Sequence, residues 1–194
     1  MAGKKSNLSD LNILLGVSGG IAAYKAVELA SKLTAVGAKV NTVMTKNACQ
    51  LIGPKSFEAV TNSAVFTSLW ERGEKYKIGH VNLADWADIV VVAPATANII
   101  GRIANGICDD LLSTTLCAAS AKPTLLAPAM NTNMWTNVAV QRNVKMVKEM
   151  GFQLIGPEEG LLACGVEGIG RMSEPQDILE ALKEMASKIK RKKK

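Results

Sequence analysis

Residues 88–93 read Asp-Ile-Val-Val-Val-Ala, an unbroken apolar run behind a single acid that predicts the central strand of a sheet. A strand that is apolar on both faces is typical of a parallel sheet covered by helices on both sides. Two further strands are expected before it, over residues 11–17 and 38–45, and two after it, over residues 123–127 and 152–155. This spacing indicates the α/β class.

Segments with helical periodicity alternate with these strands. They cover residues 21–36, a short stretch from Pro54, and residues 97–104, 110–119, 138–150 and 175–189. The least regular part, residues 61–79, is expected to form a long loop with one short strand. Alternating βα units predict one doubly wound α/β domain over residues 1–194, with a mainly parallel sheet of the Rossmann or flavodoxin-like type. Ligands of such folds bind beyond the carboxyl ends of the strands.

The net charge of +6 comes from the C-terminus. Residues 188–194 hold six of the 23 basic side chains, and the rest of the chain has 17 basic against 17 acidic residues. We therefore expect a solvated, disordered tail on a neutral body, and no nucleic-acid partner. A specific anionic partner of the tail is the alternative.

The cysteines and the N-terminus indicate a cytoplasmic protein. Four cysteines are scattered without a C-x-x-C pair, and there is one histidine, so neither a zinc site nor a disulfide framework is expected. The first ten residues, MAGKKSNLSD, lack the apolar core of a signal peptide. No apolar run reaches the roughly 18 residues of a membrane span.

Residues 16–21, Gly-Val-Ser-Gly-Gly-Ile, join the first strand to the first helix and predict an anion-binding turn. Small residues such as Ser18, Gly19 and Gly20 let backbone N–H groups approach a phosphate at a helix N-terminus. The G-x-G-x-x-G spacing is absent, and the second strand ends in Thr45 where NAD-binding proteins carry an acid. The pattern favours a mononucleotide such as FMN, with a tight turn that binds nothing as the alternative.

His80 is the only histidine of the chain, and it precedes a short amphipathic turn over residues 81–86. Its ordinary pKa lies near neutral pH, so it is a candidate general base. A structural or simply exposed histidine is the alternative interpretation.

Residues 128–135, Pro-Ala-Met-Asn-Thr-Asn-Met-Trp, follow a predicted strand and place an amide at its carboxyl end. The Asn131 amide is a candidate ligand for a substrate carboxylate. Capping of the next helix by Asn131 is the alternative.

Residues 163–172 carry three glycines around Cys164 and predict a flexible loop that closes over a site. A cysteine in such a loop can donate a proton. The other cysteines, Cys49, Cys108 and Cys117, fall in helical patterns and are expected to pack.

Together, and in this order, these segments resemble the flavin-containing cysteine decarboxylase family over roughly residues 11–175. The matching segments are residues 17–25 (VSGGIAAYK), His80, residues 93–98 (APATAN), residues 104–106 (ANG) with 110–111, residues 128–135, and residues 163–165 (ACG). The phosphopantothenoylcysteine decarboxylases of coenzyme A synthesis have the Ala-Cys-Gly loop, so Cys164 favours that branch over the peptidyl-cysteine decarboxylases of lantibiotic maturation. His80 argues against the related prenyl-flavin synthases.

The resemblance implies FMN as cofactor and a phosphorylated cysteine derivative as substrate. Thiol oxidation, loss of CO₂ and reduction of the resulting enethiol would leave no net redox change. His80 would be the base, Asn131 and Met134 would hold the carboxylate and pack the pocket, and Cys164 would supply the last proton. The residues implied around FMN are Ser18, Gly19, Gly20 and Thr45 at the phosphate and Pro94, Ala95, Thr96, Ala97 and Asn98 along the isoalloxazine.

The resemblance also implies a homotrimer, or a dodecamer built of trimers, with FMN at the subunit interfaces. A phosphopantothenate–cysteine ligase domain or protein is an implied partner. Three positions depart from the family pattern: Gly20 replaces a serine, Asp85 a basic residue, and Val166 an acid. The alternatives are a peptidyl-cysteine decarboxylase, a flavin-binding regulatory subunit without activity, and an unrelated nicotinamide dehydrogenase.

Overall fold

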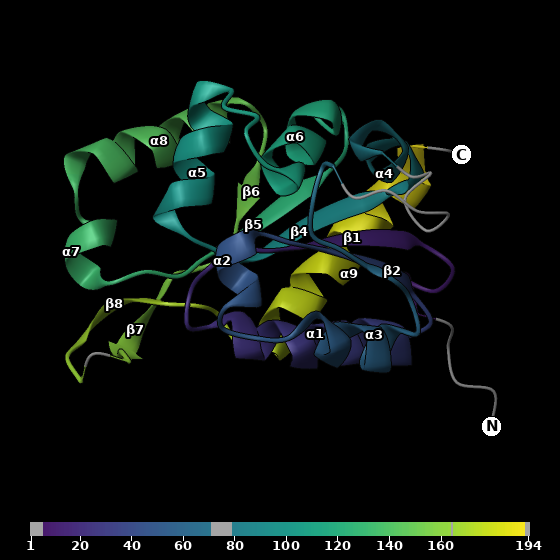
Figure 1. The fold of residues 1–194 in the computed structure, drawn as a ribbon, viewed down its shortest axis with the longest axis horizontal. Coiled ribbons are helices and arrows are strands. Elements are labelled where there is room, and N and C mark those ends of the chain that lie inside the picture. The colour runs from purple at the N-terminus through teal and green to yellow at the C-terminus, as the bar shows by residue number, and fades with distance from the viewer. Residues whose placement is uncertain (1–5, 71–78, 164, 193–194) are drawn as a thin grey trace.

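The computed structural model describes residues 6–70, 79–163 and 165–192, and Figure 1 shows its fold. Within these ranges, a six-stranded parallel sheet runs in the order β3-β2-β1-β4-β5-β6. Its strands are β1 (Asn12–Val17), β2 (Lys39–Met44), β3 (Val65–Phe66), β4 (Ile89–Ala95), β5 (Thr124–Pro128) and β6 (Gln153–Leu154). The predicted doubly wound α/β fold is confirmed.

Helices cover both faces of this sheet (Figure 1). One face carries α1 (Ala23–Ala35), α3 (Pro54–Thr61) and α9 (Pro175–Lys192). The other carries α4 (His80–Trp86), α5 (Ala97–Asn105), α6 (Leu111–Ala118) and α8 (Val138–Glu149). Successive side chains of a strand point to opposite faces, so Leu15 packs in the first core and Leu14 in the second.

Every residue of β4 is buried, as the apolar run of residues 88–93 predicts. The strand lies between β1 and β5, and its register with β5 shifts between Val92 and Ala95. Pro94 lies inside this irregularity. Proline has no N–H to donate to a neighbouring strand, so it is tolerated within a sheet at such points.

Two helices of four residues each were not predicted, α2 (Lys46–Cys49) and α7 (Thr132–Trp135). Such short helices show no measurable periodicity. Each begins at a side-chain cap: Thr45 accepts from the Ala48 N–H, and Asn131 accepts from the Asn133 N–H. The capping interpretation of Asn131 is therefore confirmed.

The prediction of a flexible loop over residues 163–172 is wrong for its second half, residues 167–171. Strands β7 (Glu158–Leu161) and β8 (Glu167–Arg171) pair antiparallel in a hairpin, and Met130 N donates to Gly170 O at 3.0 Å to attach it to the α/β body. The glycines obscured the strands because glycine is rare in strand interiors. Cys164 lies outside the described residues.

Two further predictions need correction. Cys108 lies in the loop between α5 and α6, and both Cys108 and Cys117 are exposed, whereas Cys49 packs against the core as expected. Helix α9 continues to Lys192, so the expected disordered tail is helical over most of its length. Lysine and arginine are good helix formers and are favoured at a helix C-terminus. None of the helices in the described ranges is both long and apolar enough to cross a membrane.

Candidate functional site

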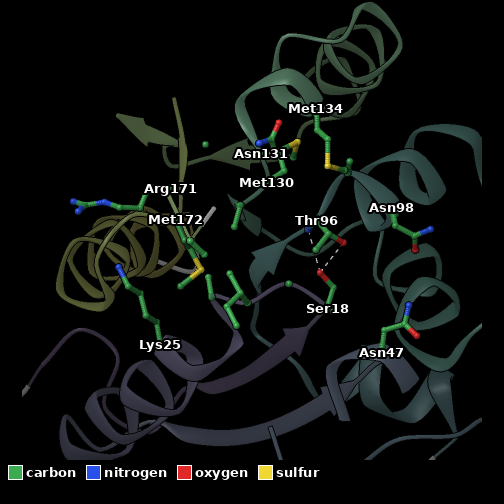
Figure 2. Close-up of a pocket in the computed structure, with 18 of the residues that line it drawn as sticks. Ser18, Lys25, Asn47, Thr96, Asn98, Met130, Asn131, Met134, Arg171 and Met172 are labelled. Atoms are coloured by element: carbon green, nitrogen blue, oxygen red, sulfur yellow. Dashed lines mark hydrogen bonds between the residues drawn. The ribbon is translucent and has the colours of Figure 1, made fainter. Parts of the chain in front are cut away.

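A cavity of ≈ 1120 Å³ lies at the carboxyl ends of β1 and β4. These two strands are neighbours in the sheet, and the chain order reverses between them. Such a reversal leaves a crevice between the loops that follow the two strands, where doubly wound folds bind ligands. Figure 2 shows three groups of side chains around this cavity: Ser18 with Thr96 and two asparagines, Met130 to Met134, and Lys25 with Met172.

The turn after β1 brings backbone close to the cavity. Gly19 packs so tightly that an added Cβ would lie 2.4 Å from the Asn47 Cβ, and one at Gly20 would lie 3.1 Å from the Thr96 Cγ2. Helices α1 and α5 both begin here, and the first N–H groups of a helix have no partner within that helix. The wall thus presents backbone donors and the positive ends of two helix dipoles, which together favour an anion.

The Ser18 hydroxyl is used inside the protein. It is buried, and its Oγ lies 2.7 Å from the Pro94 carbonyl oxygen and 3.0 Å from the Thr96 Oγ1. The Thr96 N–H donates to the same Oγ at 3.1 Å. Ser18 therefore ties the loop after β1 to the end of β4. Thr45 Oγ1 accepts from the Ala48 N–H as the cap of α2, and its hydroxyl can still donate a hydrogen bond.

A charged corner lies where α1 meets the hairpin and the start of α9. Lys25 Nζ donates to Glu174 Oε1 at 2.8 Å, and only 13% of the Lys25 side chain is exposed. Arg171 approaches Glu174 at 3.6 Å and Glu158 at 3.4 Å. The hydrogen bond from Lys25 lowers the pKa of the Glu174 carboxyl, and the charges of Lys25 and Arg171 add to this effect against partial burial.

Arg102 and Asp110 form a second charged wall. The guanidinium of Arg102 binds both Asp109 and Asp110, and Asp110 also caps α6 through the Ser113 N–H at 2.7 Å. Over its whole described lining, the cavity has four cationic side chains (Lys25, Lys46, Arg102 and Arg171) against two carboxylates (Asp110 and Glu174). Both carboxylates are paired with cations, so the remaining charge of the lining is positive.

The third side of the cavity comes from the segment after β5. Met130, Asn131 and Met134 line it, and Met134 is 47% exposed. Asn131 Oδ1 accepts from the Asn133 N–H at 2.8 Å, which fixes the orientation of the amide at the start of α7. Flexible methionine side chains around one oriented amide suit a partly apolar ligand with a polar end.

The structure brings most of the predicted site residues together. Pro94 and Ala95 are buried in β4 beneath the wall and do not line the cavity. Those that line it are Ser18, Gly19, Gly20, Thr45, Thr96, Ala97, Asn98, Asn131 and Met134.

His80 does not line the cavity within a single chain. It is the first residue of α4, which follows Gly79 and packs against α6. His80 is half-buried, and it lies on the face of the sheet that carries α4 and α6. Within one copy of the chain, His80 and Asn131 therefore do not line the same cavity.

Sequence reasoning missed the charged residues of the lining. Lys25 lies in a matching motif without an assigned role, and Arg171 and Glu174 meet it across more than 140 positions of sequence. Asp110 also lies in a matching segment without an assigned role, and Arg102 lies in none. Ion pairs between distant segments have no sequence spacing that could reveal them.

Residues 1–187 match the family model described as Flavoprotein. A coenzyme A biosynthesis bifunctional protein CoaBC of Bacillus subtilis is 49% identical over 173 residues, which are 89% of this chain and 42% of that protein. The corresponding Escherichia coli protein is 43% identical over 180 residues, 93% of this chain and 42% of its own length. The chain thus spans less than half of the length of these curated relatives.

Solved structures share the fold over nearly their whole length. A PPC decarboxylase mutant complexed with pantothenoylaminoethenethiol has a TM-score of 0.79 and 34% identity, over 91% of this chain and 98% of that one. The FMN-dependent cysteine decarboxylase SpaF has a TM-score of 0.78 and 36% identity, over 93% and 99% of the two chains.

Proposed function

Because the chain belongs to the flavoprotein family, we propose that it is an FMN-dependent decarboxylase that converts 4'-phosphopantothenoylcysteine to 4'-phosphopantetheine in coenzyme A biosynthesis. The observation that carries this proposal is the cavity in which the backbone turn at Ser18 faces the Asn131 segment. The CoaBC relatives and the PPC decarboxylase structure support the substrate.

The cavity fits FMN in volume and charge. Its ≈ 1120 Å³ exceeds the range of common small-molecule sites, which leaves room for a flavin together with a substrate. The starts of α1 and α5 supply backbone donors for a terminal phosphate, and the positive lining suits its charge. Thr96, Ala97 and Asn98 continue the wall beyond this point, where a ring system would lie.

Bound FMN would supply the two-electron chemistry that oxidises the substrate thiol and later reduces the enethiol. The residues of the chain would bind and orient the substrate and supply protons to it. The Asn131 amide, held by its own cap, would bind the carboxylate that leaves as CO₂. Met130 and Met134 would exclude water from that carboxylate, since loss of CO₂ is easier from an apolar surrounding.

Lys25 is the candidate contact for the phosphate of the substrate. It lies on the side of the cavity that also carries Arg171 and Met172 (Figure 2), and its side chain is largely buried. Glu174 pairs with both Lys25 and Arg171, and Glu158 also pairs with Arg171, so the charges of this corner balance until an anion displaces one of the carboxylates. Arg171 Nε is buried and has no hydrogen-bond partner among the described residues.

We further propose that the site is completed between subunits of a homotrimer. Within one chain, His80 begins α4, which packs against α6, and it is not part of the cavity lining. A neighbouring copy could present its own His80 to the open side near Asn131, where it would act as the base for the substrate thiol. A larger dodecameric assembly, a ligase domain or protein as partner, and a cytoplasmic location belong to the same proposal.

Cys164 would protonate the enethiol during its reduction. The position lies outside the described residues, and the proposal rests on the family resemblance of residues 163–165. The neighbouring residues Leu162 and Ala163 line the cavity, which supports a role at this side. Replacement by serine should leave CO₂ release intact and let enethiol accumulate.

A peptidyl-cysteine decarboxylase, the other branch of the resemblance, is the second candidate, because the FMN-dependent cysteine decarboxylase SpaF matches the fold as well as the PPC decarboxylase does. The two differ in whether the substrate carries a phosphate. The excess of cationic side chains in the cavity lining, Lys25 among them, favours the phosphorylated substrate.

The deciding experiment is anaerobic incubation of the purified yellow protein with phosphopantothenoylcysteine, following CO₂ and the mass of the product. Lys25→Met should raise KM for this substrate and leave KM for its dephosphorylated form unchanged. A protein that takes up no flavin, or that turns over only peptides ending in cysteine, would refute the proposal.

His80→Asn tests the shared site. It should keep the flavin absorbance and abolish CO₂ release, and mixing it with an Asn131→Ala variant should restore part of the activity. Such rescue requires that the two residues act across a subunit interface. Two inactive variants that stay inactive after subunit exchange, confirmed by mass, would contradict an interfacial site.

A further inference from the structure

The thiols of Cys108 and Cys117 lie side by side on the surface. Cys108 is in the loop before α6, with its Sγ 3.6 Å from the Gly106 carbonyl oxygen and 4.0 Å from that of Ser113. Cys117 lies one helical turn after Ser113, on the same face of α6. Both side chains are exposed, and the neighbouring Cys117 raises the pKa of the Cys108 thiol.

We propose that Cys108 and Cys117 are a modification site at which peroxide-class oxidants form a reversible disulfide. A thiolate of the pair attacks hydrogen peroxide, so that one S–O bond forms, the O–O bond breaks, and a sulfenic acid and water result. The second thiol then displaces the hydroxyl group as water and forms the S–S bond. In total, two thiols lose two electrons and two protons to the peroxide, which becomes two molecules of water.

The position of Cys108 favours this bond. It lies in a loop of five residues between α5 and α6, which can adjust to the geometry of a disulfide more easily than a residue inside a helix. Because Cys117 belongs to the last turn of α6, only its side chain must turn towards the partner. The loop adjoins the cavity, since Asp110 both caps α6 and lines the cavity wall.

The charges around the pair set its reactivity. Partial burial raises the pKa of the Cys108 thiol, and the neighbouring Cys117, Asp109 and Asp110 raise it further. Arg102 forms ion pairs with both aspartates. The thiolate fraction of Cys108 at neutral pH is therefore low, which makes the pair a slow target that responds to sustained oxidation.

The test treats the flavin-loaded protein with hydrogen peroxide, alkylates the remaining thiols and maps the peptides by mass. No lysine or arginine lies between Cys108 and Cys117, so trypsin leaves both in one peptide that contains no other cysteine. The peptide covers residues 103–142, because trypsin does not cleave between Lys122 and Pro123. This peptide should lose two hydrogens and resist alkylation, and dithiothreitol should reverse both changes. Cleavage before Asp109 should then fail to separate its two halves until the sample is reduced.

Cys108→Ser and Cys117→Ser should each abolish the intrapeptide bond, whereas Cys49→Ser, at a half-buried position on the opposite side of the sheet, should leave it unchanged. Retained flavin absorbance and circular dichroism would show that the variants fold. Full alkylation of both thiols after oxidation of the wild type, or pairing of either thiol with Cys164 or with a second chain, would overturn the proposal.

Discussion

Gly170→Ala should detach the hairpin from the wall of the cavity. Gly170 has a φ of +149°, and an added Cβ would lie only 2.0 Å from the Met130 carbonyl oxygen. Since real Cβ atoms do not approach closer than 3.0 Å, β8 and the Met130 segment would have to separate by about 1 Å. The 3.0 Å bond from Met130 N to Gly170 O would lengthen beyond hydrogen-bond range.

The expected loss of stability in Gly170→Ala has two causes. Backbone strain at this φ costs about 1–3 kcal/mol, and the lost hydrogen bond about 1 kcal/mol. Gly160→Ala is the matched control, because Gly160 has a φ of +151° and an added Cβ would meet only the flexible Arg171 side chain, at 3.5 Å. Gly160→Ala should therefore show the strain without the collision.

Urea unfolding of both variants, with flavin affinity and turnover measured alongside, provides the assay. We expect Gly170→Ala to be at least about 1 kcal/mol less stable than Gly160→Ala and to lose substrate affinity, because Met130 and Asn131 move with the hairpin contact. If the two variants are equally stable and Gly170→Ala binds substrate as the wild type does, the proposed attachment of the hairpin is wrong.

Three other substitutions test the walls of the cavity. Ser18→Ala should lower the free energy of unfolding by about 1–3 kcal/mol, because it removes buried hydrogen bonds between two loops. The control Ser31→Ala, on the exposed surface of a helix, should change the free energy of unfolding by less than about 0.5 kcal/mol. Glu174→Gln should flatten the pH dependence of stability below about pH 5. The pKa of Glu174 is lowered in the folded state, so the ionised carboxylate stabilises the fold above its ordinary pKa of 4.5, and this contribution disappears as the pH falls. The contribution is under about 1 kcal/mol for a half-exposed ion pair. Asp110→Ala should cost about 1–2 kcal/mol through loss of the helix cap, and Asp109→Ala, which breaks only an exposed ion pair, under about 1 kcal/mol.

Local patterns predicted the central sheet well. The apolar run of β4 and the βα alternation determine burial and connection, and both depend on neighbouring residues alone. The sequence did not reveal α2, α7 or the β7–β8 hairpin. The two helices are too short to show periodicity. The hairpin is held by contacts with Met130, which the sequence does not show, and its glycines hide its strand character.

The site residues that lie just after the end of a strand could be predicted from the sequence. Ser18, Thr96 and Asn131 each lie just after a strand, so parallel topology brings them together. Lys25 and Glu174 meet only because α1 and α9 pack on the same face, which no spacing in the sequence encodes. His80 follows no strand, and its distance from the cavity lining depends on how α4 packs.

The Ser18 hydroxyl is used within the protein, so main-chain amides, with the hydrogen that the Thr45 hydroxyl can still donate, are left to contact an anion at this turn. Amides do not titrate in the physiological range, and their strength does not depend on which side chain they carry. Retention of a phosphorylated ligand should therefore follow the second ionisation of its own phosphate, near pH 6, and no protein group. The same turn should tolerate changes of side chain that preserve its backbone path.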